Sequence, residues 1–187
     1  MRIGLIADTH MPGSIQHLWP QVLEAFSDVD CILHAGDLHT LDIVDELTLL
    51  APTYVSRGNG DRGLVDDRLR DNWQLEFSGV SIGMIHHFPS PIRKTSEDIF
   101  RYIDKHFETR PNILIYGHTH LEGMHHVEEM LCINPGSPTL PRNQSLRMGT
   151  IGILEITPKV TESTIYQLEP NGVEVQQIVK WEGDNGL

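Results

Sequence analysis

The chain has 187 residues, of which 39% are hydrophobic and 21% charged, enough for one domain with a buried core. Its 26 acidic and 14 basic residues give a net charge of −12, which makes a long nucleic acid an unexpected partner. There is no apolar run of about 18 residues, and Asp8 directly follows the first short apolar segment, so we expect neither a membrane span nor a secretory signal. Cys31 and Cys132, both inside apolar runs, predict reduced core thiols and a cytoplasmic protein.

The first two thirds of the chain alternate between predicted strands and helices. Five apolar runs that end in glycine or polar residues predict strands at residues 2–7, 30–33, 53–56, 80–85 and 112–116. Ser14 is expected to cap a first helical pattern that Pro20 interrupts, so that this helix begins late or kinks. Thr40 and Thr95 are expected to cap two more, each followed by apolar residues at helical spacing.

The rest of the chain favours strands. WQLEFSGVSIGMIH, residues 73–86, is typical of a hairpin with a Ser-Gly turn. After residue 123 the pattern predicts only strands, at residues 124–127, 130–133, 150–156 and 163–168, and residues 177–187 have no assigned role. We therefore expect one α/β domain over residues 1–187, with two packed sheets and helices outside.

Polar side chains that suit metal ions follow five of the predicted strands. They are the carboxylates, amide and imidazoles of LIADTH, LHAGD, SRGNGD, GMIHH and YGHTH: Asp8, His10, Asp37, Asn59, His86, His118 and His120. Each segment alone is ordinary turn chemistry. Strand ends of an α/β sheet converge at one edge, and together the side chains form the ligand set that a pair of metal ions requires.

The order of these motifs resembles the calcineurin-like metallophosphoesterase superfamily, over about residues 1–168. INPGSPTLPR, which follows the last motif, resembles the family's small bacterial and archaeal phosphodiesterases. The resemblance implies a four-layer α-β-β-α sandwich with two mixed β-sheets. It also implies that Asp8, His10 and His120 hold one divalent metal ion and that Asn59, His86 and His118 hold another. Asp37 would bridge the two ions.

Such a pair of ions acts on phosphate esters by simple electrostatics. Two cations roughly 3.5–4 Å apart polarise a phosphate and lower the pKa of a shared water, whose hydroxide attacks phosphorus. Neutral imidazole ligands keep the site positive, which attracts a phosphate to an acidic protein. Manganese is the expected metal, while iron, zinc and nickel also suit these ligands.

Three positions depart from the resemblance near the expected site: Met11, Gly60 and His87, which stands where glycine commonly follows the strand histidine. Met11 stands where many relatives have glycine. Gly60 stands where larger phosphatases of the superfamily carry a histidine that helps to protonate the leaving group. Without that partner, Asp61 is expected to orient its loop.

Other polar residues have two interpretations each. His87, beside His86, is a candidate general acid, although a surface position or a contact with a ligand is the commoner role for such a histidine. His34 and His39 are expected to support the ligands or the loop. Three arginines are candidates for phosphate contacts or for ion pairs: Arg57, Arg62 and Arg142.

The leading functional prediction is a dinuclear metal-dependent phosphodiesterase that hydrolyses small phosphodiesters. A phosphomonoesterase or a nuclease on short nucleic-acid ends is the alternative within enzymes. A non-catalytic scaffold, similar to the retromer subunit of this superfamily, is the alternative from another class, and the presence of all seven ligand types argues against it. The sequence leaves open whether the protein is a homo-oligomer.

Overall fold

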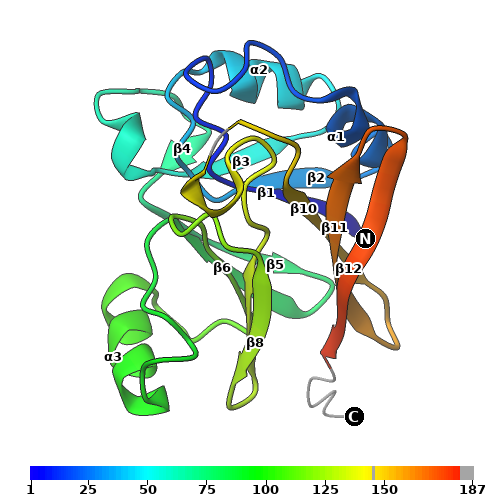
Figure 1. Cartoon of the computed structure of the whole chain (residues 1–187). Helices are drawn as coiled ribbons and strands as arrows, with labels where there is room; N and C mark the ends of the chain where they lie inside the picture. The colour runs from blue at the N-terminus through cyan, green and yellow to red at the C-terminus, as the bar shows by residue number, and fades with distance from the viewer. Residues whose placement is uncertain (145, 182–187) are drawn as a thin grey trace.

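The computed structural model describes residues 1–144 and 146–181 of the chain. In this part, twelve strands form two sheets, with strand orders β12-β11-β10-β1-β2-β3-β4 and β5-β6-β7-β9-β8 (Figure 1). The strands are β1 Arg2–Ile6, β2 Cys31–His34, β3 Thr53–Ser56, β4 Leu69–Arg70, β5 Asn72–Phe77, β6 Val80–Ile85, β7 Ile113–Ile115, β8 Gly123–Val127, β9 Met130–Asn134, β10 Thr150–Ile156, β11 Thr161–Glu169 and β12 Gly172–Trp181. The helices are α1 Pro20–Ala25, α2 Asp42–Thr48 and α3 Ser96–His106, with short 3₁₀ turns η1 Asn59–Asp61 and η2 Pro141–Asn143.

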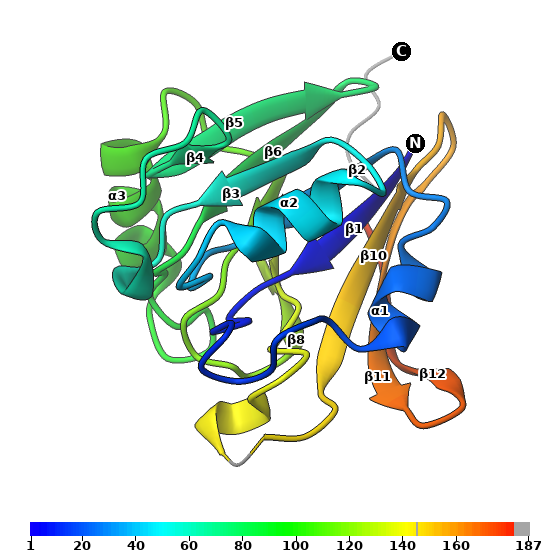
Figure 2. The same cartoon turned by 90° about the horizontal axis from the view of Figure 1, so that it is seen from above.

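The two sheets pack face to face, and helices cover their outer faces. One buried apolar cluster, including Leu5, Leu33, Ile82 and Ile115, fills the space between the sheets. A second joins α1 and α2 to the larger sheet, and a third joins α3 to the smaller one. Figures 1 and 2 show α1 and α2 on one side of the molecule and α3 on the other. The predicted four-layer sandwich with two mixed sheets is confirmed.

Strand direction explains how one edge collects the polar segments. β1, β2 and β3 run parallel to one another, as do β6, β7 and β9, while the remaining β1 neighbour, β10, is antiparallel. The carboxyl ends of neighbouring parallel strands meet at the same edge of a sheet. The loops that follow β1, β2, β3, β6 and β7 carry the predicted ligands.

The helix caps differ from two of the three predictions. α1 begins only at Pro20, with Trp19 before it, and Ser14 instead donates its hydroxyl to the Thr9 carbonyl. α2 follows Leu41 without a side-chain cap, since the Thr40 hydroxyl is directed to the Met11 carbonyl. The prediction for α3 is confirmed, because Thr95 Oγ1 accepts the Asp98 amide at 3.2 Å.

The predicted hairpin is β5-β6, with Ser78 and Gly79 between its strands, and both residues have positive φ as a tight turn requires. The chain after residue 168 forms the long edge strand β12, which the sequence did not predict. Residues 177–181 of the unassigned segment belong to it, and residues 182–187 lie outside the described residues.

Cys31 and Cys132 are free and buried, as expected, and burial raises the pKa of each thiol to about 12. Across residues 1–144 and 146–181, no helix is both long and apolar enough to cross a membrane.

Candidate metal centre

The seven predicted ligands lie together where the central strands end. Asp8 and His10 follow β1, Asp37 follows β2, and Asn59 opens η1 after β3. His86 follows β6, and the two histidines of the GHTH segment follow β7. Contacts of 4.0 Å or less, described below, connect all seven side chains.

Five of these residues have a left-handed backbone, which turns each loop sharply after its strand. The φ angles are 54° at Asp8, 49° at His10, 60° at Asp37, 71° at His118 and 55° at His120. Residues other than glycine adopt this conformation at a cost, so the surrounding contacts must hold it. Two such contacts are the hydrogen bonds from the Asp8 amide to the Gly36 carbonyl (2.9 Å) and from the His10 amide to the Asp37 carbonyl (3.0 Å). Strain concentrated in this way is typical of a functional site.

One group of side chains combines Asp8, His10 and His120. The Nε2 atoms of the two histidines are 3.1 Å apart, and Asp8 Oδ1 is 3.9 Å from His120 Nε2. Their ligand atoms all lie within 4.8 Å of one another, the spacing around a single ion. This is the trio expected to hold the first metal ion.

A second group gathers around the Asn59 side-chain oxygen. This oxygen is 3.0 Å from His118 Nδ1 and 3.3 Å from His86 Nε2. Asp37 lies between the two groups, with Oδ1 3.5 Å from His86 Nε2 and Oδ2 3.5 Å from His10 Nε2. Each oxygen of the Asp37 carboxylate therefore faces one group, which is an arrangement that suits a bridging ligand.

Backbone carbonyls determine which histidine nitrogens point into the site without a proton. His86 Nδ1 is 2.7 Å from the Ala35 carbonyl, and His120 Nδ1 is 2.7 Å from the Leu140 carbonyl. A carbonyl oxygen only accepts, so Nδ1 carries the proton in both rings and Nε2 presents a lone pair to the carboxylates.

A buried acceptor without a donor, close to other ligand atoms, favours a bound cation. Among the described residues, Asp8 Oδ2 is buried without a hydrogen-bond partner. Burial, and next the neighbouring Asp37, raise the pKa of the Asp8 carboxyl well above its usual range. Burial likewise lowers the pKa of His10 to about 4, which disfavours an imidazolium there. Oxygen and neutral imidazole ligands suit divalent transition metals, so the donor set fits the predicted metal ions.

Asp61 is a fully buried clamp between two of the site's loops. Its Oδ1 accepts the amides of Leu38 (2.7 Å) and His39 (3.0 Å), and its Oδ2 accepts those of Asp37 (2.9 Å) and Gly58 (2.8 Å). Four backbone donors leave the carboxylate little capacity for other chemistry. This geometry supports the orienting role predicted for Asp61.

The segment INPGSPTLPR hydrogen-bonds to the backbone of two loops of the site, those after β1 and β7. Ser137 Oγ donates to the Asp8 carbonyl at 2.7 Å, and Thr139 Oγ1 donates to the Thr9 carbonyl at 2.9 Å. Asn134 Nδ2 donates to the Gly117 carbonyl at 3.0 Å. These supporting residues were not predicted individually, although the segment itself was part of the resemblance.

His39 and His34 both contact the loops of the site, as expected. His39 Nε2 is 2.8 Å from His10 Nδ1, and a Cβ atom at Gly60 would lie only 2.6 Å from the His39 ring. The His39 imidazole therefore occupies the space beside Gly60. His34 is fully buried, with Nδ1 accepting the Gly36 amide and Nε2 3.1 Å from Thr9 Oγ1.

The remaining candidates lie around the edge of the site. The exposed His87 ring stands edge-on to that of His118, with centroids 4.8 Å apart, and burial and His118 lower its pKa. Arg57 donates a hydrogen bond to the Leu64 carbonyl and forms an ion pair with Asp71, and Arg62 is exposed. Arg142 pairs with Glu122, as the ion-pair alternative predicts.

Comparison with known proteins identifies the family. Residues 1–159 match the model of the calcineurin-like phosphoesterase superfamily domain. Over 144 residues, the chain is 41% identical to a "Probable metallophosphoesterase" of Methanothermobacter thermautotrophicus, covering 76% of this chain and 80% of the relative. A phosphodiesterase of Methanocaldococcus jannaschii is 29% identical over 171 residues, covering 85% of this chain and 95% of the relative.

Solved structures share the fold of this chain. Vacuolar protein sorting 29 of Cryptosporidium parvum superposes with a TM-score of 0.79 over 97% of both chains, at 16% sequence identity. At that identity the match shows a shared fold and nothing of activity. Because the family model spans most of the chain and the donor set described above suits metal ions, this protein belongs to the calcineurin-like phosphoesterase superfamily, a family of metallophosphoesterases that use divalent metal ions.

Proposed function

We propose that the protein is a metal-dependent phosphodiesterase that hydrolyses small phosphodiesters at a dinuclear centre. The observation that carries the proposal is the position of Asp37, whose two oxygens each lie 3.5 Å from a histidine of a different group. A carboxylate shared in this way suits two cations close together. Manganese is the metal we propose, and two buried free thiols accord with a cytoplasmic location.

The chain's own residues supply the positioning that this chemistry needs. When bound, a pair of divalent cations polarises the phosphate and activates water as the nucleophile. Asp61 fixes the amide of Asp37, and the carbonyls of Ala35 and Leu140 fix the His86 and His120 rings, so the ligands need little reorganisation. His87 remains the candidate to protonate a leaving group, because its ring contacts that of His118.

A diester preference follows from the surroundings of Gly60. Gly60 has no side chain that could donate a proton, and the His39 ring, which is hydrogen-bonded to His10, fills the space beside it. Poor protonation of the leaving group favours esters whose leaving group is already a good one. The phosphodiesterase among the relatives supports the same preference. A phosphomonoesterase or a nuclease on short ends is the second candidate.

A non-catalytic scaffold is the alternative that the shared fold with vacuolar protein sorting 29 favours. The unpartnered, buried Asp8 Oδ2 supports a bound cation, which a scaffold of this fold can also hold. Hydrolysis of a phosphate ester is therefore the property that separates the two functions.

Hydrolysis of two chromogenic esters tests the proposal. Manganese-loaded protein should turn over bis-p-nitrophenyl phosphate faster than p-nitrophenyl phosphate, and chelation should abolish both activities. His118→Ala should lose activity, while His126→Ala, which removes an exposed histidine from β8, should keep it. Failure of the metal-loaded protein to hydrolyse either ester would favour the scaffold, and a preference for the monoester would favour the second candidate.

A further inference from the structure

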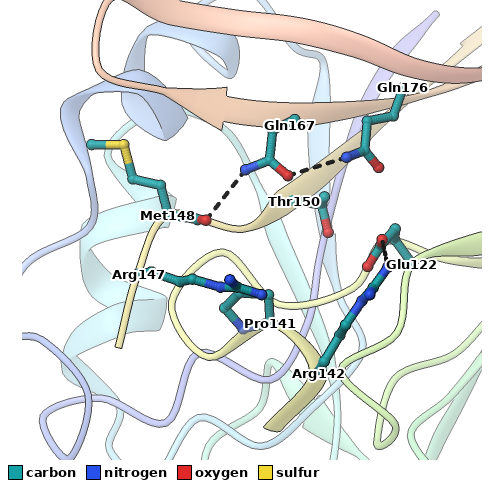
Figure 3. A pocket seen from close by; sticks show the side chains of 8 residues that line it. All are labelled: Glu122, Pro141, Arg142, Arg147, Met148, Thr150, Gln167 and Gln176. Carbon is teal, nitrogen blue, oxygen red and sulfur yellow. Dashed lines mark hydrogen bonds and ion pairs between the residues drawn. The ribbon is translucent and has the colours of Figure 1, made fainter. Parts of the chain in front are cut away.

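A polar cavity of about 300 Å³ lies beside the turn that supports His120 (Figure 3). Several separate segments build it: the loop before β8, η2 and the loop after it, and the strands β10, β11 and β12. Its polar lining comes from Glu122, Arg142, Arg147, Thr150, Gln167 and Gln176. Neither the ligand set nor the resemblance assigns a role to this cavity.

Two arginines give the cavity positive charge on an acidic protein. Arg142 Nη2 is 3.5 Å from Glu122 Oε1, a long contact that leaves most of its donors available. Among the described residues, no carboxylate lies within 4.0 Å of the Arg147 guanidinium. The backbone amide of Arg147 donates to the Thr139 carbonyl at 3.0 Å. Figure 3 shows the Arg147 side chain extending to Pro141, in the direction of Arg142 and Glu122.

The opposite wall is neutral and held by its own hydrogen bonds. Gln167 Nε2 donates to the Met148 carbonyl at 3.2 Å, and Gln176 Nε2 donates to Gln167 Oε1 at 3.1 Å, as Figure 3 shows. Gln167 Nε2 also donates to the Leu168 carbonyl at 3.0 Å, so both of its hydrogens are used within the protein, and Gln176 keeps one amide hydrogen for a polar ligand.

The cavity and the metal centre share one turn. The Leu140 carbonyl accepts His120 Nδ1, and the Arg142 amide donates to the His120 carbonyl, both at 2.7 Å. Arg142 itself has a left-handed backbone, with φ 57° and ψ 26°, so this turn sets the direction of its side chain. Arg142 is therefore joined by a backbone hydrogen bond to His120, a predicted metal ligand.

We propose that Arg142 and Arg147 form a binding site for the phosphate group of a small organic phosphate. A guanidinium presents a planar pair of donors that matches two phosphate oxygens, and with Glu122 counted the lining keeps one net positive charge for the phosphate. Glu122 keeps its own partner in Arg142 and leaves Arg147 as the principal contact. The volume exceeds that of a phosphate alone and leaves room for an attached polar group such as a sugar.

The phosphate has two sources that one site can serve. It is either a second phosphate of the substrate hydrolysed at the centre, which rests on the function proposed above, or the phosphate of a separate small molecule. Both sources need the same two arginines, so a binding measurement tests the site and a kinetic measurement identifies the source.

Nuclear magnetic resonance on zinc-loaded protein measures the binding without any need for turnover. Titration with inorganic phosphate should shift the side-chain amide signal of Gln176, which has one hydrogen not used in the bond to Gln167. Arg147→Gln and Arg142→Gln should each weaken this binding by about tenfold or more, which corresponds to about 1.4 kcal/mol. Arg101→Gln is a matched control, since the side chains of Arg101 and Arg142 are both 58% exposed and both pair with a carboxylate. The other signals show that each variant remains folded.

Steady-state kinetics then compares thymidine 5′-(p-nitrophenyl phosphate) with the same ester carrying a 3′-phosphate. A lower KM for the phosphorylated ester, lost in Arg147→Gln, assigns the site to the substrate's second phosphate. Equal KM values, with phosphate binding still dependent on Arg147, assign it to a separate molecule. The proposal is overturned if the Gln176 signal does not respond to phosphate, or responds equally in wild type and Arg147→Gln. Lack of turnover would count against the proposed function and leave the binding result decisive for the site.

Discussion

The clamp formed by Asp61 gives the account its most quantitative prediction. Replacing Asp61 by asparagine keeps the size of the side chain but converts one acceptor oxygen into an NH₂ donor. Whichever way the amide turns, two of the four backbone amides that Asp61 accepts at 2.7–3.0 Å lose their partner. Each buried N–H left without an acceptor costs about 1–3 kcal/mol, so Asp61→Asn should lower the free energy of unfolding by about 2–6 kcal/mol.

This loss is a large share of the total stability of a domain, which is about 5–15 kcal/mol. Urea denaturation of metal-free protein measures it, and Asp104→Asn on the surface of α3 serves as the control, with a much smaller loss expected because its ion pair with Arg110 is exposed. Because the clamp also fixes the Asp37 amide, isothermal titration calorimetry should show manganese affinity about tenfold weaker or worse. Wild-type stability and wild-type manganese affinity in folded Asp61→Asn would refute the reasoning.

Three further predictions concern the histidines and Asp8. The His34 pKa is lowered from 6.5 to about 4 by burial, so the neutral ring stabilises the fold above pH 6.5 and that stability is lost as the pH falls through 4. The loss should approach about 3 kcal/mol. In urea denaturation, the free energy of unfolding of His34→Gln should depend less on pH between 4 and 6.5 than that of wild type, and equal dependence would show that the His34 pKa is not lowered in the fold. His39→Ala should weaken manganese binding about tenfold in calorimetry and His39→Gln less, because glutamine can still accept from His10 Nδ1; equal affinities would show that His39 has no positioning role. Asp8→Asn should raise the melting temperature of metal-free protein near pH 8, where a buried carboxylate is costly, yet abolish stabilisation by manganese; retained stabilisation would contradict a ligand role.

Much of the fold could be predicted because its central strands are apolar runs with clear ends. β3, β6 and β10 begin and end where the sequence places them, and α3 has its Thr95 cap. Helix α1 is shorter than its pattern because the segment before Pro20 is a loop that Ser14 ties to Thr9. Edge strand β12 escaped prediction because its register shifts between the pairs Val175–Tyr166 and Gln177–Ile165, so its apolar residues do not keep one continuous alternation.

The candidate site was predictable in its residue types but not in its supports. Side chains such as Asp37 and His118 are visible in the sequence, and their motif order suggested one centre. The carbonyls of Ala35 and Leu140, which orient two of the rings, are backbone atoms that no side-chain pattern reveals. The arginine cavity is hidden for a related reason, since segments far apart in the chain build it.

Anomalous diffraction from manganese-loaded crystals, recorded at the manganese absorption edge, tests the central claim most directly. The account predicts two peaks, one bonded to Asp8, His10 and His120 and the other to Asn59, His86 and His118. Each peak should also lie within bonding distance of one oxygen of Asp37. A single peak, or peaks away from these side chains, would contradict the dinuclear centre.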